Sequence, residues 1–428
     1  MATIDELLEE ANQRYSGDLL WACLCPNFLW GRQPPWTTLL RGFAANLLSP
    51  RAPTNVVMAG RVVSMWHDSN SERAIKPIVN LLHPKEQEVV SYGPRGAAAI
   101  LRHWAGDQDI VRLGIAILKA AGQGHLSNRW RYRCVRARRM LMWCEALFRS
   151  RRPAVLLVAN QAEAHMRAAI LTARKLGIAS VLVPHAPVAR LPWSPDLPCD
   201  YVGLRGTGEA DYYRALGCAP DRLTVIGNPA SDVVGYSVPE SRTGLGVLAM
   251  PAESSTVLEQ IIGLIAAGTS QPLLVSPHPR SNLDELRAIL PRHWILSHQD
   301  RTLDLIKQGP PFLIQCSSGV AWESLVCGVP TANIVLDKPS FYPFFDDRRL
   351  VRHLSNAADV REFVETPGDG SEERARRKSY ALHWCGQDGQ PAGRAGAELV
   401  ERAVAEGAKD MILDGWAPGG AVWSSLGL

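Results

Sequence analysis

The strongest constraint on the fold is a repeated order of short apolar run, amphipathic helix and short apolar run. The run AVLLVAN, residues 154–160, is followed by AEAHMRAAILTARKLG and then by IASVLVPHAP. In the middle stretch, Met166, Ala169, Ile170 and Ala173 recur at helical spacing. This order predicts a strand, a helix and a second strand, and such units form parallel sheets that helices cover on both faces.

The same rhythm restarts later in the chain. Residues 231–246 are polar and rich in turn formers, and beyond them PLLVSPHP, PFLIQCSSG and TANIVLD read as strands between helices. A chain of 428 residues exceeds the size at which one core keeps growing. We therefore predict an α/β fold of two Rossmann-like doubly wound domains, over 1–235 and 236–390, which face each other across a cleft. Near the start, NVVMAGRVVS predicts one strand.

Composition narrows the classes of function. Lys and Arg total 46 against 42 Asp and Glu, and a net charge of +4 gives no reason to expect a nucleic-acid partner. Nine cysteines without a C-x-x-C pair predict neither disulfides nor a zinc site. The acidic N-terminus and the lack of an eighteen-residue apolar stretch predict a soluble, cytoplasmic protein. The sequence carries no signal of oligomeric state.

The turn after PFLIQC is the first candidate binding element. Ser317, Ser318 and Gly319 follow a strand and precede a buried helix, where ligands of open parallel sheets bind. Glu323 lies one helical turn further on, so its carboxylate could accept from both hydroxyls of a ribose. The serines could instead only cap the helix, and Glu323 could pair with a buried arginine.

His278 stands between Pro277 and Pro279 at the end of another predicted strand. Proline restricts its own backbone and that of the preceding residue, so the imidazole is held in an extended turn. It could donate a hydrogen bond to a phosphate oxygen at the same edge of the sheet. The alternative is a loop histidine that only backbone groups satisfy.

These motifs together resemble a known group of enzymes. HPR at 278–280, SSG at 317–319, Glu323 and GVP at 328–330 resemble the C-terminal half of nucleotide-sugar enzymes with the glycosyltransferase-B fold. The group includes capsule and surface-polysaccharide transferases, teichoic-acid glycerophosphotransferases and non-hydrolysing UDP-N-acetylglucosamine 2-epimerases. VIGNPASD at 225–232 and the turn that contains Asp388, Gly389 and Arg394 fit the same pattern, and the likeness spans residues 154–407.

The resemblance implies a division of roles. It adds Arg280 to the nucleotide-sugar contacts and implies that residues 391–428 form a helix that returns to the first domain. We therefore expect an inverting, metal-independent glycosyltransferase that uses a nucleotide-sugar donor, an acceptor hydroxyl and no further cofactor. The alternatives are a UDP-sugar 2-epimerase, a CDP-glycerol-type glycerophosphotransferase, and a non-catalytic nucleotide-sugar-binding partner of a transferase.

The catalytic base is not decided by the sequence. Transfer requires a base from the first domain, and Glu163, His165 and His185 stand at predicted strand ends. Many relatives carry Q-H-G where this chain has P-H-A at 184–186, and the acidic motif of polysialyltransferases is not found. His278 would assist by neutralising the departing phosphate.

Two further features have less specific interpretations. Asp107 and Asp109 form a D-x-D pair, but they lie between helix-like stretches, which favours a solvated loop over a metal site. Residues 129–152 hold many arginines beside an apolar stripe. Such a helix can contact an anionic membrane peripherally or bind an acidic acceptor, or its stripe can pack inward while the arginines stay solvated.

Overall fold

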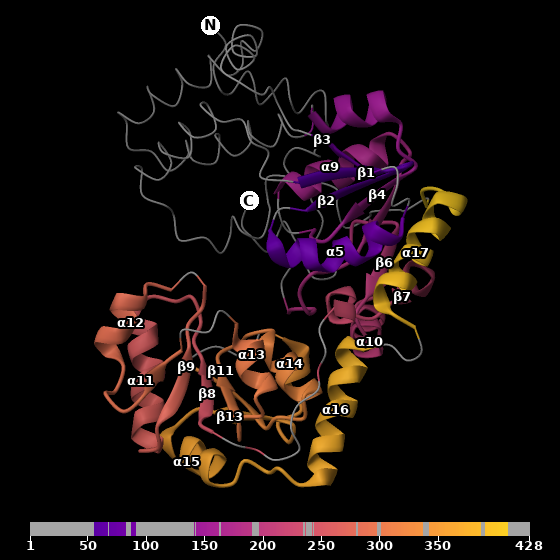
Figure 1. Ribbon diagram of the computed structural model, residues 1–428. Coiled ribbons are helices and arrows are strands. Elements are labelled where there is room, and N and C mark those ends of the chain that lie inside the picture. The colour runs from indigo at the N-terminus through magenta and orange to yellow at the C-terminus, as the bar shows by residue number, and fades with distance from the viewer. Residues whose placement is uncertain are drawn as a thin grey trace, which may run out of the picture.

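The computed structural model describes two α/β units (Figure 1). The described residues are 55–90, 141–190, 197–233, 236, 242 and 244–409, without 67, 83–86, 142, 162–163, 280, 298–300, 337–341 and 387–389.

The first unit is built on a seven-stranded sheet in the order β3-β1-β2-β4-β5-β6-β7. From β2 to β7 neighbouring strands run parallel, whereas β1 pairs antiparallel with both β2 and β3. The strands are β1 (Asn55–Ala59), β2 (Val62–Trp66), β3 (Gln87–Val90), β4 (Val155–Val158), β5 (Ala179–Leu182), β6 (Tyr201–Leu204) and β7 (Leu223–Val225).

The prediction of one strand over NVVMAGRVVS is wrong, because the chain turns back in its middle. Gly60 has a φ of 58°, a left-handed conformation that glycine adopts without steric cost, and the two halves pair as β1 and β2. The predicted βαβ unit is confirmed as β4, α9 (Ala164–Lys175) and β5.

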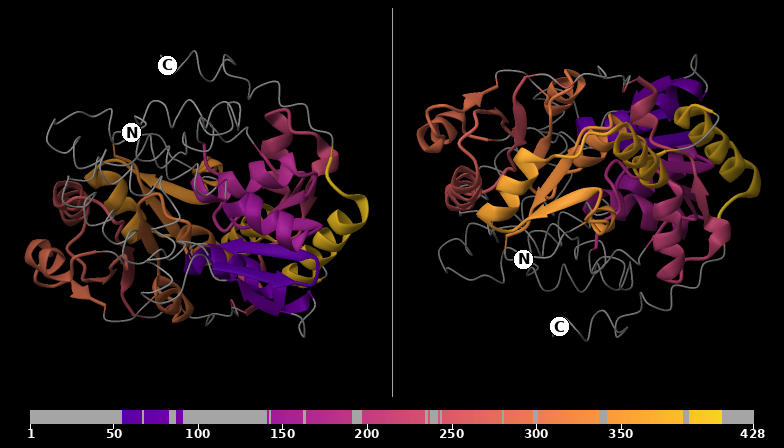
Figure 2. Two further views of the ribbon diagram at one scale, coloured as in Figure 1. Left: turned by 90° about the horizontal axis from the view of Figure 1, so that it is seen from above. Right: turned by 90° about the horizontal axis from the view of Figure 1, so that it is seen from below.

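Helices cover both faces of the first sheet, as the views from above and from below show (Figure 2). Because side chains alternate along a strand, Leu156 and Val158 pack toward α9 and α10 (Thr207–Ala215). Val155 and Leu157 pack on the opposite side, in the core shared with α5 (Ser69–Leu81) and α17 (Ala392–Glu406). Short 3-10 turns, η1 (Pro220–Arg222) and η2 (Pro229–Val233), flank β7.

The second unit has six parallel strands in the order β10-β9-β8-β11-β12-β13. Thus the two-sheet α/β fold predicted from the sequence is confirmed. The strands are β8 (Gly246–Ala249), β9 (Leu273–Ser276), β10 (Ile295–Leu296), β11 (Leu313–Gln315), β12 (Thr331–Ile334) and β13 (Val351–Leu354).

Two groups of helices enclose the second sheet. One core joins the sheet to α11 (Ser255–Gly268), α12 (Leu283–Ile289) and α15 (Ala357–Glu365). The cores on the other face include α13 (Thr302–Lys307), α14 (Val320–Val326), η3 (Pro343–Phe345) and α16 (Ser371–Cys385).

The chain returns to the first unit through α16 and α17. The end of α16 meets the start of α10 so closely that a Cβ at Gly206 would lie 2.4 Å from the backbone of Trp384. The carboxylate of Asp232, in η2, accepts from the N–H groups of Ala392 and Gly393 at 2.9 and 2.6 Å. It thereby satisfies two of the orphan donors at the start of α17.

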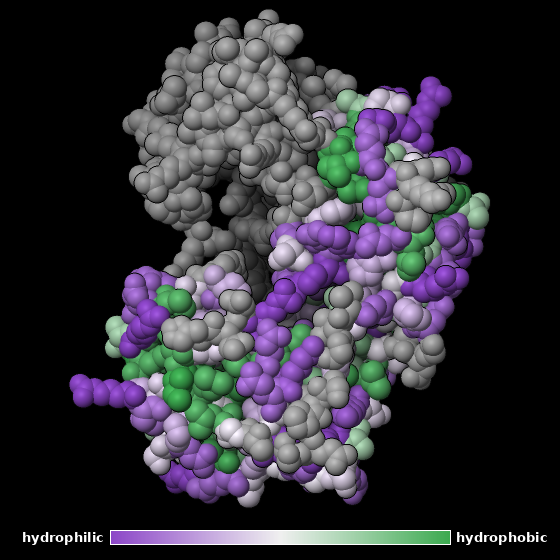
Figure 3. Space-filling view, in the orientation of Figure 1, coloured by the Kyte–Doolittle hydropathy of each residue, from purple (hydrophilic) through white to green (hydrophobic). Residues whose placement is uncertain are grey.

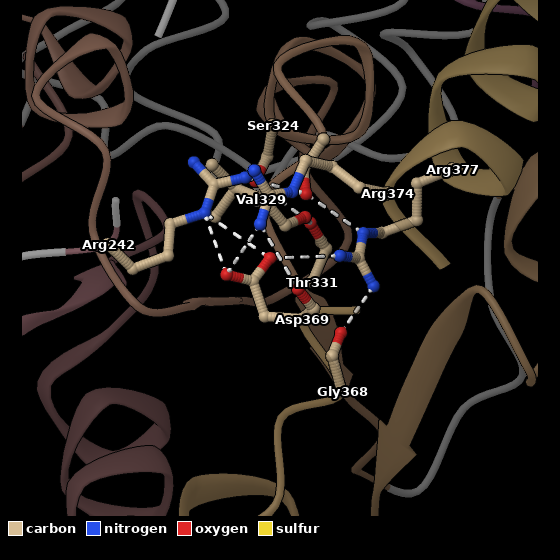
Figure 4. Close-up of polar contacts among 9 residues, drawn as sticks. Arg242, Ser324, Val329, Thr331, Gly368, Asp369, Arg374 and Arg377 are labelled. Atoms are coloured by element: carbon tan, nitrogen blue, oxygen red, sulfur yellow. Dashed lines mark hydrogen bonds and ion pairs between the residues drawn. The ribbon is translucent and has the colours of Figure 1, made fainter. Parts of the chain in front are cut away.

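A cluster of three arginines around Asp369, which we call the clasp, joins the segment before β8 to the first half of α16 (Figure 4). Arg242 precedes β8, whereas Arg374 and Arg377 belong to α16, and all three approach the Asp369 carboxylate at 3.3 to 3.4 Å. Arg242 and Arg377 also both donate to the carbonyl of Gly328 at 3.0 Å. Burial lowers the pKa of Arg377 to about 10, against the opposing effect of Asp369.

The basic segment at 129–152 is described only in part. Residues 129–140 lie outside the described residues, but Cys144, Leu147 and Phe148 are buried in the core of the first unit. Arg149 donates to Glu145 and Arg151 donates to Glu88. In the part that is described, the apolar stripe therefore packs inward. No helix of the described residues combines the length and the hydropathy needed to cross a membrane.

We expect Asp369→Asn to lower the free energy of unfolding by about 3 kcal/mol, because it leaves buried guanidinium groups without their carboxylate. Urea unfolding followed by circular dichroism measures the change. Glu362→Gln, which breaks the exposed ion pair with Arg352, is the matched control and should cost under about 1 kcal/mol. Equal losses in the two variants would contradict a special role for the clasp.

Candidate functional site

The carboxyl ends of strands from both sheets meet at the junction between the units. The turn 184–187 follows β5 and the turn 316–319 follows β11. A Cβ added at Gly319 would lie 3.6 Å from Cδ of Pro187, so the two turns are in contact range. Ligands of open α/β sheets bind at this edge, and here each unit presents it to the other.

Two further contacts span the junction. The guanidinium carbon of Arg205, which directly follows β6, lies 5.4 Å from the ring centroid of Trp322 on α14. Arg190 donates through both Nη atoms to the two carboxylate oxygens of Asp346. That pair is exposed, so it lies at the rim of the junction. Hydrophilic side chains line the boundary between the units on the face seen in Figure 3.

The backbone of the 316–319 turn is strained at Ser317. Its φ of 45° lies in the left-handed region, which is costly for a residue with a Cβ. Its N–H donates to Asn333 Oδ1 at 2.8 Å, and the N–H of Ser318 donates to Gln315 Oε1 at 2.6 Å. Two N–H groups of the predicted phosphate turn are therefore already bound within the protein, and a ligand would meet the Ser317 hydroxyl instead.

The capping alternative for Ser318 has geometric support. Its Oγ accepts from the N–H of Val320 at 3.3 Å, a weak bond at the start of α14. Because α14 is a single seven-residue helix, its dipole adds little to anion binding. The Ser318 hydroxyl can still donate its hydrogen to a ligand while it caps the helix.

A buried amide pair supports the strained turn. Gln315 and Asn333 are the register partners near the carboxyl ends of β11 and β12, and Gln315 Nε2 donates to Asn333 Oδ1 at 3.0 Å. Both side chains are buried, and Asn333 Nδ2 has no hydrogen-bond partner among the described residues. Sequence reasoning missed this pair, although each amide interrupts a largely apolar run (FLIQC, TANIVL).

Glu323 faces the junction from α14. Its side chain is partly buried, and within the described residues no hydrogen bond or ion pair is found for its carboxylate. Burial raises the pKa of Glu323, and Arg205 is the foremost of the cations that oppose this shift. The sequence left open that Glu323 pairs with a buried arginine. Arg205 is such an arginine, but it acts on Glu323 through its charge alone, because its guanidinium does not hydrogen-bond to the carboxylate.

Arg205 is the second residue that sequence reasoning missed. It is 4% exposed, and its Nε and Nη1 have no acceptor among the described residues. Glu209 balances its charge, but the Glu209 oxygens accept from the backbone N–H groups of Arg205 and Val188, each at 2.9 Å. The feature of the sequence that could have pointed to Arg205 is its place directly after the apolar strand YVGL.

His185 is the described base candidate at the end of β5. Its Nδ1 lies 2.9 Å from the carbonyl oxygen of Ala159. Because a carbonyl can only accept, Nδ1 carries the proton in the neutral imidazole and Nε2 carries the lone pair. This tautomer suits a general base. Glu163 and the side chain of His165 lie outside the described residues.

His278 stands at the carboxyl end of β9, on the same edge of the sheet as the 316–319 turn. Its carbonyl accepts from the N–H of Ser281 at 2.8 Å, which closes a turn. The strand β8 separates β9 from β11, so the two elements are two strand spacings, roughly 10 Å, apart. A ligand as long as a diphosphate with its sugar is needed to contact both.

The remaining sequence candidates are not covered by the structure. Arg280, Asp107 and Asp109 lie outside the described residues. Among the residues that the structure does describe, no group of three His, Cys, Asp or Glu side chains is arranged to hold a metal ion.

Comparisons with known proteins give low similarity throughout. No family model and no curated protein matches the sequence. Among solved structures, the UDP-GlcNAc 2-epimerase from Neisseria meningitidis bound to UDP-GlcNAc is 13% identical, with a TM-score of 0.44 over 63% of this chain and 81% of that chain. A putative UDP-N-acetylglucosamine 2-epimerase from Listeria monocytogenes is 16% identical, with a TM-score of 0.44 over 63% and 80%.

Glycosyltransferases occur among the similar structures as well. The lipopolysaccharide outer core galactosyltransferase WaaB is 13% identical, with a TM-score of 0.40 over 63% of this chain and 80% of that chain.

We expect Ser317→Gly to raise the free energy of unfolding by about 1 kcal/mol, because glycine adopts the left-handed conformation without strain. Ser317→Ala removes the hydroxyl but keeps the Cβ, so it should give no such gain. Urea unfolding of the three proteins compares them directly. If glycine and alanine have the same effect, strain at this position is not the cause.

Proposed function

We propose that the protein is a nucleotide-sugar enzyme, and specifically an inverting glycosyltransferase, with its donor site at the junction between the units. The observation that carries the proposal is Glu323, a partly buried carboxylate for which the described residues offer no hydrogen bond or ion pair. Burial disfavours the charged form of this carboxylate, and a ligand that donates hydrogen bonds to it would offset that cost. The vicinal hydroxyls of a ribose are such donors.

The donor would extend from Glu323 across the end of the second sheet. Its phosphates would accept from the hydroxyls of Ser317 and Ser318 and from His278, and Arg280 would add a cation. The separation of roughly 10 Å between the ends of β9 and β11 suits a diphosphate that carries a sugar. In this proposal the reaction takes no metal ion and no cofactor besides the donor.

The acceptor would approach from the first unit, where His185 is the proposed base. Nε2 would remove the proton of the acceptor hydroxyl while that oxygen attacks the anomeric carbon. The bond from the sugar to the nucleotide phosphate breaks on the opposite face, so the configuration inverts. Fixed donors at the phosphate stabilise the charge that develops on the leaving group.

One observation argues against Glu209 as a proton-transfer group for the 2-epimerase alternative. An epimerase moves protons at the sugar with carboxylates, and Glu209 is the buried carboxylate that follows β6. Both of its oxygens are held by backbone N–H groups, and the residue is 1% exposed. Glu209 is therefore poorly placed to exchange protons with a ligand. A CDP-glycerol donor would show as preferential binding of CDP, and a purely binding role as nucleotide binding without consumption of the donor.

We expect Glu323→Gln to lower nucleotide affinity ten-fold or more, because an amide cannot accept charge-assisted hydrogen bonds from both ribose hydroxyls. Thermal-shift screening with UDP, CDP, CMP, dTDP and GDP selects the nucleotide, and calorimetry measures its affinity. Asp304→Asn, on the exposed side of α13, is the control. No binding of any of the five nucleotides by the wild-type protein would sink the proposal.

The same substitution should stabilise the free protein at pH 7. The raised pKa of Glu323 means that folding disfavours its charged form, so ionisation costs stability as the pH rises above about 4.5, the usual pKa of a glutamate. Glutamine does not ionise, so Glu323→Gln should unfold at a higher temperature than wild type at pH 7. The difference should vanish near pH 4.

We expect His185→Gln to slow consumption of the donor by 100-fold or more, with unchanged nucleotide affinity, because it removes the base and leaves the phosphate contacts intact. Release of UDP from UDP-N-acetylglucosamine, with water as acceptor, provides the assay. His353→Gln, at a half-buried histidine that bonds to the carbonyl of Phe345, is the control. Conversion to the 2-epimer without release of UDP would instead identify an epimerase.

A further inference from the structure

We propose that Arg205 is a positioning residue of this site, which holds the Glu323 carboxylate ionised and directed toward the hydroxyls of a bound nucleotide. The inference rests on the proposed function and adds a contribution from the first unit to donor binding. Arg205 would act through Glu323 rather than by contact with the reacting atoms.

The position of Arg205 fits this role. It follows β6 at the carboxyl edge of the first sheet, and its guanidinium lies over the ring of Trp322, 5.4 Å from the centroid. Trp322 immediately precedes Glu323 on α14, and its Nε1 donates to the carbonyl of Ala381 at 2.8 Å. The ring is therefore fixed, and a cation stacked on it is held beside the start of the helix that carries Glu323.

The hydrogen bonds of Arg205 leave part of its guanidinium unused. Glu209 accepts from the backbone of Arg205, not from its Nε or Nη1, and neither of those atoms has an acceptor among the described residues. Burying such donors without partners costs on the order of 1–3 kcal/mol each. A buried guanidinium with two unused donors in one unit thus acts on a partly buried carboxylate in the other, which is unfavourable for folding alone and useful for binding.

Arg205 is also the cation whose field is least screened by solvent. The other cations that act on Glu323 are Arg73 on α5, Arg301 before α13 and Lys307 on α13, and each of these is exposed or partly exposed. The other titratable groups that interact with Glu323 are Tyr236, Cys327 and Cys385. Burial raises the pKa of all three, so they stay uncharged at neutral pH. Arg205 is then the main charge that opposes the effect of burial on the pKa of Glu323.

The test measures UDP affinity between pH 6 and pH 9 in wild type, Arg205→Lys and Arg205→Met. Above pH 7 the wild-type affinity should be nearly constant. Arg205→Met should bind at least ten-fold more weakly at pH 7 and recover affinity toward pH 9, because Glu323 then ionises at higher pH. Arg205→Lys retains the charge and should restore the wild-type profile. Arg190→Met, which breaks the rim ion pair with Asp346, is the control and should not alter the profile.

The outcomes separate this inference from the proposed function. If Glu323→Gln weakens UDP binding but Arg205→Met keeps the wild-type pH profile, the role of Arg205 is overturned while the donor site stands. Should Arg205→Met not fold, carbon-13 NMR of labelled glutamate in the wild-type protein decides, with Glu323 assigned by Glu323→Gln. A titration midpoint below pH 7 supports the inference, and a midpoint above pH 7 overturns it.

Discussion

One carboxylate, Asp369, joins the segment that enters the second sheet to the helix that leads back to the first unit. Arg242 lies on the chain that enters the second unit, and Arg377 lies on the helix that leaves it. Both also donate to the carbonyl of Gly328, at the end of the helix that carries Glu323. The end of α16 contacts the start of α10, directly after Arg205. The clasp therefore anchors the first half of α16 to the second unit, and the end of the same helix contacts the first unit beside Arg205.

At that junction the protein keeps several groups that folding alone would not favour. Ser317 has a left-handed backbone, the carboxylate of Glu323 finds no hydrogen bond in the described residues, and Arg205 buries donors without acceptors. Each feature costs free energy, and together they lie where the carboxyl ends of parallel strands meet. Unfavourable features that cluster at one place are typical of binding sites, where a ligand supplies the missing partner.

The proposed site draws its residues from both units. The second unit supplies Glu323 and the serine turn, whereas the first supplies His185 and Arg205. Pro187 and Gly319 lie within contact range, so the turns that contain them are close enough to bind one ligand. A buried amide pair, Gln315 and Asn333, holds the serine turn in place, so the geometry of the site depends on residues that do not themselves face the junction.

Local sequence determined the elements and the carboxyl ends at which candidates stand, because apolar periodicity and turn residues act within a few positions. It predicted the two sheets, the turn at 317–319 and the place of His278. Tertiary structure decided what each candidate meets. Gln315 and Asn333 occupy N–H groups expected to be free, and Arg205 comes to face Glu323 across more than a hundred residues. Such partnerships depend on strand order and on the packing of the units, which no local pattern encodes.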